Sequence, residues 1–129
     1  MWQQYNPNQR GQRVGDCTVR AIAGALGMDW PTVYWMICIE GAIQQDMPDA
    51  DAVWGAYLER MGYRRRLVEA ECSKCYTVRD FAREHPLGTY ILCPKGHVIC
   101  VKDGNWWDTW DSGDERPIYY WQKEDTANV

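Results

Sequence analysis

Cys17 and His97 are the two residues of this sequence whose types and settings could carry out covalent chemistry together. Cys17 lies in Gly15-Asp16-Cys17-Thr18, directly before an apolar, alanine-rich stretch, and His97 follows Gly96 at the start of an apolar run. The N-terminus of a helix favours the thiolate, which is the reactive form of cysteine, and a nearby imidazolium lowers the thiol pKa further. The pair therefore predicts a cysteine nucleophile with a histidine base, against the simpler interpretation that both residues only pack.

A predicted β-hairpin supplies a carboxylate that could orient His97. Apolar runs flank Asp103-Gly104, and Asp-Gly in that setting is a strong signal for a two-residue hairpin turn. In the register that this turn sets, His97, Asp108 and Trp110 share one face of the sheet, and Asp108 is the diagonal neighbour of His97. Asp108 is thus predicted to fix the histidine tautomer and to stabilise the imidazolium.

These residues also carry a resemblance to a known family. Cys17 before a helix, then Gly96-His97-Val98, then Asp108-Thr109-Trp110 resemble, in the same order, the papain-like cysteine peptidase pattern of Cys, His, and Asn or Asp followed two residues later by Trp. The chain is most similar to the compact bacterial and phage type, such as the bacteriocin-leader peptidases, over about residues 6–121.

The resemblance implies a fold and an activity. The fold is α+β and papain-like, with N-terminal helices packed on a C-terminal antiparallel sheet. The activity is that of a cysteine peptidase or related thiol hydrolase, which cleaves an amide or isopeptide bond of a protein or peptide through an acyl-enzyme with Cys17, His97 and Asp108 as the triad. Trp110 would shield the contact between His97 and Asp108 from water. No cofactor and no metal are expected.

An acyl-transfer site also needs hydrogen-bond donors for the oxyanion. The backbone amide of Cys17 could supply the first donor. The amide-rich stretch 6–12 offers candidates for the second, of which the resemblance favours Gln12, with Asn6, stiffened by Pro7, as the runner-up. Each of these side chains is equally well explained as a solvated amide in a polar loop.

Two departures from the papain-like pattern keep a different class of function open. Thr18 stands where papain-type enzymes carry Trp after the nucleophile, and Asp16 puts a negative charge beside the thiol. The alternative is a catalytically inactive papain-like module, for example phage-encoded, that binds a host protein or peptide. Transamidases and amidases share the acyl-enzyme and also stay open. A lowered Cys17 pKa would favour an enzyme, since a binding module has no need of a thiolate.

Length and composition bound the remaining possibilities. The 129 residues suit one domain over 1–129, and 46% apolar with 25% charged residues is ordinary for a globular chain. A net charge of −4 disfavours nucleic-acid binding, and no apolar run is long enough for a membrane span. The first residues lack the basic and apolar regions of a signal peptide, so a cytoplasmic location is expected. The oligomeric state cannot be predicted, and the tail over about 123–129 is expected to be mobile.

Six cysteines without an export signal are expected to be thiols. Cys38 and Cys100 fall in apolar runs and are predicted to pack in the core. Cys72-Ser73-Lys74-Cys75 is predicted to form a simple turn. Two alternatives for it are a zinc site completed by His85 and Cys93, and a redox pair.

Four helices and a sheet are predicted to position the candidate site. Helices are expected over about 17–26, 29–40, 48–62 and 77–84, with Asp16, Asp29 and Thr77 as N-caps, and strands over 63–68, 89–93, 98–102, 105–110 and 118–122. The run Arg64-Arg65-Arg66 is typical of an exposed edge strand. Trp30 and Trp35 are expected to pack helix against helix.

Overall fold

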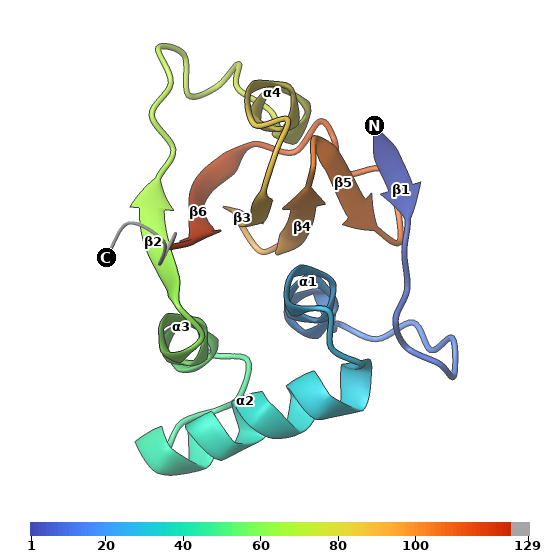
Figure 1. Ribbon diagram of the computed structural model, residues 1–129, viewed down its shortest axis with the longest axis vertical. Helices are drawn as coiled ribbons and strands as arrows, with labels where there is room; N and C mark the ends of the chain where they lie inside the picture. Colours follow the sequence, from blue (N-terminus) through green and yellow to red (C-terminus); the bar gives the residue numbers. More distant parts are fainter. Residues whose placement is uncertain (125–129) are drawn as a thin grey trace.

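The computed structural model describes residues 1–124, which form a six-stranded sheet with helices on both faces (Figure 1). The helices are α1 (Cys17–Leu26), α2 (Trp30–Gln44), α3 (Asp51–Arg60) and α4 (Val78–Glu84), and the strands are β1 (Trp2–Gln4), β2 (Tyr63–Leu67), β3 (Thr89–Pro94), β4 (Ile99–Lys102), β5 (Asn105–Asp108) and β6 (Pro117–Lys123). The α+β class is as predicted. The tail over about 123–129 was expected to be mobile. Its first residue, Lys123, ends β6, and residues 125–129 lie outside the described residues.

The strands are ordered β1-β5-β4-β3-β6-β2 in one sheet. β1 pairs with β5 in parallel, and every other neighbouring pair is antiparallel. The prediction of a purely antiparallel sheet is therefore wrong at one edge, where β1 was not among the predicted strands. The other edge is β2, so the predicted edge position of its arginines is confirmed.

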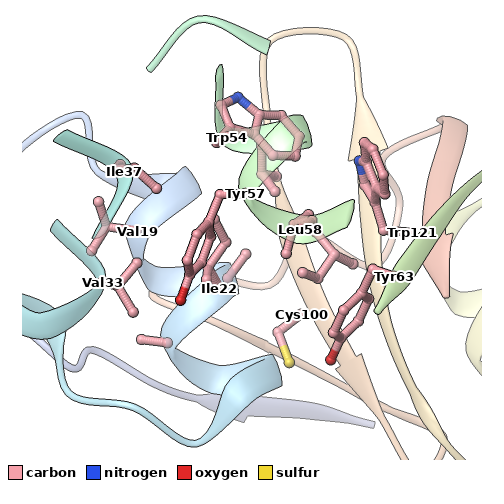
Figure 2. Close-up of a cluster of buried hydrophobic side chains, with 14 of the residues drawn as sticks. Val19, Ile22, Val33, Ile37, Trp54, Tyr57, Leu58, Tyr63, Cys100 and Trp121 are labelled. Carbon is pink, nitrogen blue, oxygen red and sulfur yellow. The ribbon is translucent and has the colours of Figure 1, made fainter. Parts of the chain in front are cut away.

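The two faces of the sheet carry separate cores. The main core, part of which Figure 2 shows, joins α1, α2 and α3 to side chains such as Ile91 and Cys100. The second core joins α4 to side chains such as Leu92 and Val101 on the opposite face. Ile91 and Cys100 face the main core, whereas their neighbours Leu92 and Val101 face the second core. This alternation is the two-residue period of a strand that is buried on both faces.

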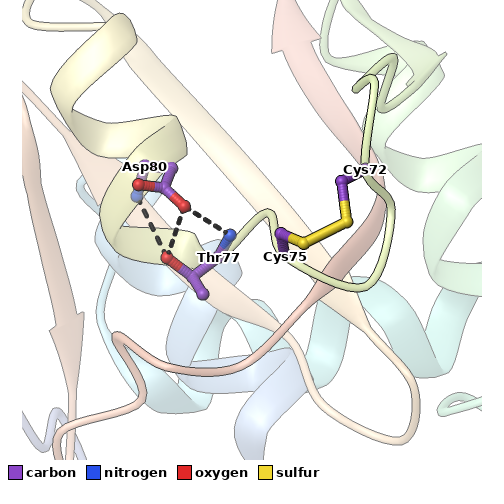
Figure 3. Close-up of a disulfide and its surroundings, with 4 residues drawn as sticks. All are labelled: Cys72, Cys75, Thr77 and Asp80. Carbon is purple, nitrogen blue, oxygen red and sulfur yellow. Dashed lines mark hydrogen bonds between the residues drawn. A yellow bond between two sulfur atoms is a disulfide. The ribbon is translucent and has the colours of Figure 1, made fainter.

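The helix ends follow local chemistry that the sequence predicts. Gly27 ends α1 in the left-handed conformation, at φ +67°, which glycine adopts without strain. The Asp29 carboxylate accepts a hydrogen bond from the Thr32 amide at 2.9 Å and caps α2. Thr77 and Asp80 form a reciprocal capping box at the start of α4 (Figure 3).

Other local predictions need correction. The Asp16 side chain does not cap α1, because its carboxylate binds side chains instead. α2 runs to Gln44 rather than Glu40, and α3 begins at Asp51. Trp35 is exposed, so it does not pack helix against helix as predicted.

The cysteines also differ from expectation in part. Cys100 is buried in the main core as predicted, whereas Cys38 is only half-buried. Cys72 and Cys75 are joined by a disulfide in the exposed loop before α4 (Figure 3), so the expectation of six thiols is wrong.

No single helix in the described part of the chain is long and apolar enough to cross a membrane. α1 and α2 meet that test of length and composition only as a pair, and they are bent by 110° relative to each other.

Candidate active site

Cys17 is the first residue of α1 and is half-buried at the N-terminus of this helix. The helix is held in place because Val19, Ile22 and Ala23 are buried in the main core. The free amides and the positive end of the helix dipole therefore lie at the thiol, as the sequence predicts.

His97 lies in the short link between β3 and β4. Gly96 precedes it at φ +71°, a conformation that favours glycine and turns the chain sharply after β3. The imidazole Nε2 lies 2.6 Å from Asp108 Oδ2. The Cys17 thiol is also close enough to the imidazole for each group to shift the pKa of the other.

Asp108 ends β5 and is almost fully buried. Its Oδ2 faces His97 and also accepts a hydrogen bond from the Ser112 hydroxyl at 2.8 Å. Its Oδ1 accepts hydrogen bonds from Arg20 at 3.2 Å and from the Thr109 amide at 2.8 Å. The carboxylate is therefore fixed by four partners, which hold one oxygen against the imidazole.

These contacts set the protonation of the pair. Burial works against ionisation of Cys17, but the hydrogen bond and charge of His97, with a backbone hydrogen bond from Val98, lower its pKa below the ordinary thiol value. Burial also works against the charged imidazole, but Asp108 and Cys17 raise the pKa of His97 to about 9. Between these two pKa values the pair is a thiolate facing an imidazolium.

Trp110 lies against His97. The two rings stack, with centroids 5.2 Å apart and an angle of 30° between their planes. The indole thus covers one side of the imidazole.

The hairpin pairs Lys102 with Asn105 as predicted, but the site does not lie on one face of the sheet. By the two-residue period of a strand, Ile99 and Trp106 would share the predicted face of His97 and Asp108, but they point into the second core, away from α1. His97 can contact Cys17 because it precedes β4, where strand alternation no longer directs its side chain. The candidate site is therefore at one end of the sheet, next to the start of α1.

Arg20 is a part of the site that the sequence analysis missed. Its guanidinium joins the carboxylates of Asp16 and Asp108, and its side chain is only 11% exposed. The Trp30 indole donates a second hydrogen bond to Asp16, at 2.9 Å. The negative charge that Asp16 was expected to place beside the thiol is thus compensated by Arg20.

Arg20 had a sequence signal that could have been used. Cys17 and Arg20 are three residues apart, so they lie on neighbouring positions of one helix turn.

Ser112 is a second residue of the site that was missed. Ser112 carries no such signal, because it reaches Asp108 only through the bend that follows β5.

The two oxyanion candidates lie on the loop between β1 and α1. Asn6 and Gln12 line a cavity of about 580 Å³ together with Arg20, Thr109 and Trp110. Asn6 Oδ1 accepts a hydrogen bond from the Asn8 amide, and both side chains are exposed. Within residues 1–124 no hydrogen bond joins either side chain to the triad, so their role stays a prediction.

The alternative zinc set is not assembled. His85 stacks on Phe81, with ring centroids 3.8 Å apart, and Cys93 is buried in the main core. Across residues 1–124, no three His, Cys, Asp or Glu side chains are grouped as metal ligands.

Comparisons with protein-family models, with curated proteins and with solved structures found no match to this chain.

Proposed function

We propose that the protein is a thiol hydrolase of the papain-like type, which cleaves an amide or isopeptide bond of a protein or peptide through an acyl-enzyme. The observation that carries the proposal is the position of the His97 imidazole, which lies between the Cys17 thiol and the Asp108 carboxylate. A sulfur, an imidazole and an orienting carboxylate in this order are the parts that nucleophilic cysteine catalysis requires.

Each residue has a defined role in the proposed reaction. The Cys17 thiolate attacks the carbonyl carbon and forms a carbon–sulfur bond, while the His97 imidazolium gives its proton to the leaving nitrogen as the carbon–nitrogen bond breaks. Neutral His97 then takes a proton from water, whose oxygen attacks the thioester and releases the acid. Cys17 leaves as a thiolate beside the imidazolium, which restores the starting state.

Asp108 supports both steps without exchanging a proton. Although burial works against the carboxylate form, His97, Ser112 and the Thr109 amide hold the pKa of Asp108 below its usual range. It therefore remains an acceptor that holds the imidazole in one orientation. Trp110 covers the imidazole, and the amides at the start of α1 lie beside the carbon that Cys17 would attack.

The proposal is tested with p-nitrophenyl acetate, an acyl donor that needs no specific substrate pocket. We expect a burst of one p-nitrophenolate per chain, and an acetyl group on Cys17 alone by peptide mapping. Cys17→Ala should abolish the burst, and His97→Ala and Asp108→Asn should slow it at least tenfold. Cys38→Ser, which removes another half-buried thiol, is the matched control and should leave the burst unchanged.

A burst that persists in Cys17→Ala, or acetylation spread over several cysteines, would contradict the proposal. An inert Cys17 in the folded protein would favour the binding module over the enzyme.

A further inference from the structure

The outer face of α2 is apolar and uncovered in the described chain. It consists of Tyr34, Trp35, Met36, Ile39 and Ile43 on the helix and Met47 just beyond it, all of which are exposed. Trp35 is 64% exposed and Ile39 is 54% exposed. We call this set of six residues the outer α2 face. Large apolar side chains gathered on one helix face mark an interaction surface, unlike apolar residues scattered singly.

The single charged residue of α2 points the other way. Glu40 is buried, and its carboxylate pairs with Arg60 of α3 at 2.8 Å and accepts a hydrogen bond from Gln44 at 2.9 Å. The helix thus turns its charge inward and large apolar side chains outward, the reverse of an ordinary surface helix. Covering the outer α2 face would remove these apolar side chains from water, which is favourable.

We propose that the outer α2 face binds the same face of a second copy of this chain and forms a symmetric dimer. Met36, Ile39 and Ile43 follow the three- and four-residue spacing of a helix–helix seam. A two-fold axis at Ile39 places Trp35 of each copy opposite Ile43 of the other. The face is therefore complementary to itself, with a large ring against a smaller side chain at both ends.

The size of the face suits this partner. Tyr34 lies at the edge of the face, and the other five side chains, which are 39–66% exposed, offer roughly 500 Å² if the aromatic range of about 150–250 Å² per side chain is taken as a guide. Two copies would together bury roughly 1,000 Å², which is about the smallest total area of a specific interface and suits a weak dimer.

Charge favours a protein partner over a lipid surface. A helix that lies on a membrane normally carries Lys or Arg beside its apolar face. α2 has neither, and it is flanked by Asp29, Asp46 and Asp49 in a chain of net charge −4. If the two helices cross at about 50°, the acidic ends diverge. Higher salt should then strengthen the dimer slightly.

The test is sedimentation equilibrium of the full chain at 1–100 μM and two salt concentrations. We expect a concentration-dependent shift from 15.1 kDa to twice this mass. Ile39→Glu places two like charges across the two-fold axis and should weaken dimerisation at least hundredfold. Ile118→Glu is the matched control, because Ile118 is 53% exposed in β6, and it should dimerise as the unchanged protein does.

A mixing experiment tests the symmetry. Ile39→Glu and Ile39→Lys should each be monomeric alone, and an equimolar mixture should recover the dimer because residue 39 faces itself across the axis. Far-UV circular dichroism checks that both variants fold.

Three results would overturn the proposal: a monomer at 100 μM, a dimer that Ile39→Glu leaves intact, or a monomer whose tryptophan fluorescence shifts on neutral phosphatidylcholine vesicles. The last result would assign the face to a lipid surface.

Discussion

Asp108 joins residues from three separate parts of the chain, since its partners are His97, Arg20 and the bend that holds Ser112. A carboxylate only accepts hydrogen bonds, and here it faces donors on both oxygens. An asparagine in its place would turn its amide hydrogens toward one set of these donors. The hydrogen-bond pattern therefore specifies aspartate at this position.

Arg20 is the buried cation that makes this arrangement possible, so we predict that Arg20→Met destabilises the protein strongly. The change leaves the carboxylates of Asp16 and Asp108 buried without their guanidinium, which should cost about 3–5 kcal/mol. Arg64→Met is the matched control. It breaks an ion pair with Glu124 in which the Arg64 side chain is 60% exposed, and it should cost about 0–1 kcal/mol. Urea unfolding at pH 7 measures the free energy of unfolding of both variants. Equal decreases in the two variants would contradict the role of Arg20 as a buried counter-ion.

The sequence could single out Cys17, His97 and Asp108 because residue type and local pattern agree at each of them. Cys17 precedes a helix, and the Asp-Gly turn sets the register that relates His97 to Asp108. It could not predict Ser112, whose contact depends on a bend without a sequence signal. It also gave the wrong reason for the meeting of His97 and Cys17, because the face of a strand does not extend beyond its last paired residue.

At the scale of elements, the turn from α2 into α3 requires a residue without a side chain. A Cβ atom on Gly41 would lie 2.7 Å from the Asp46 carbonyl oxygen, and this oxygen belongs to the backbone. The chain can therefore return toward α3 only because position 41 is glycine.

We predict that Gly41→Ala destabilises the protein, although alanine favours a helix over glycine by about 1 kcal/mol. The clash with Asp46 outweighs this preference, and a net loss of about 1–3 kcal/mol is expected. Gly15→Ala is the control, because a Cβ there meets nothing within 4 Å. Thermal unfolding measures the stability of both variants. A Gly41→Ala protein more stable than the unchanged protein would contradict the prediction, because the turn would then have moved to accept the Cβ atom.

Most elements could be predicted because their ends carry caps and turns. Asp29, Thr77 and Gly27 each mark a boundary that the structure confirms. β1 could not be predicted, because three residues with two glutamines have no strand pattern until they pair with β5. The exposure of Trp35 could not be predicted either. A helix with apolar residues on every side gives no sequence signal for the side that faces the core.

At the scale of the whole molecule, the site depends on the complete fold. The start of α1, the link before β4 and the end of β5 meet at one end of the sheet, and each is held by one of the two cores (Figure 1). No single part of the chain contains the site.

We therefore predict that Cys17 loses its special reactivity only when the whole domain unfolds. In urea, its fast labelling should disappear with the same midpoint at which tryptophan fluorescence changes and buried Cys93 and Cys100 become reactive. A Cys17 transition well below the common midpoint would show that the site opens locally.

Iodoacetamide labelling across pH 5–10, with mapping of all six cysteines, shows whether Cys17 is an activated thiolate. Burial raises the pKa of Cys93 and of Cys100 to about 12, and Cys72 and Cys75 are joined, so half-buried Cys17 and Cys38 are the thiols open to labelling. Cys17 should react faster than Cys38, because His97 lowers the pKa of Cys17. Its thiolate forms above its lowered pKa, and His97 stays protonated up to about 9.

We expect the labelling rate of Cys17 to rise well below the ordinary thiol pKa of about 8.5, and to fall at least tenfold at pH 6.5 in His97→Ala. A Cys17 that titrates as an ordinary thiol, with a rate that His97→Ala leaves unchanged, would contradict this expectation.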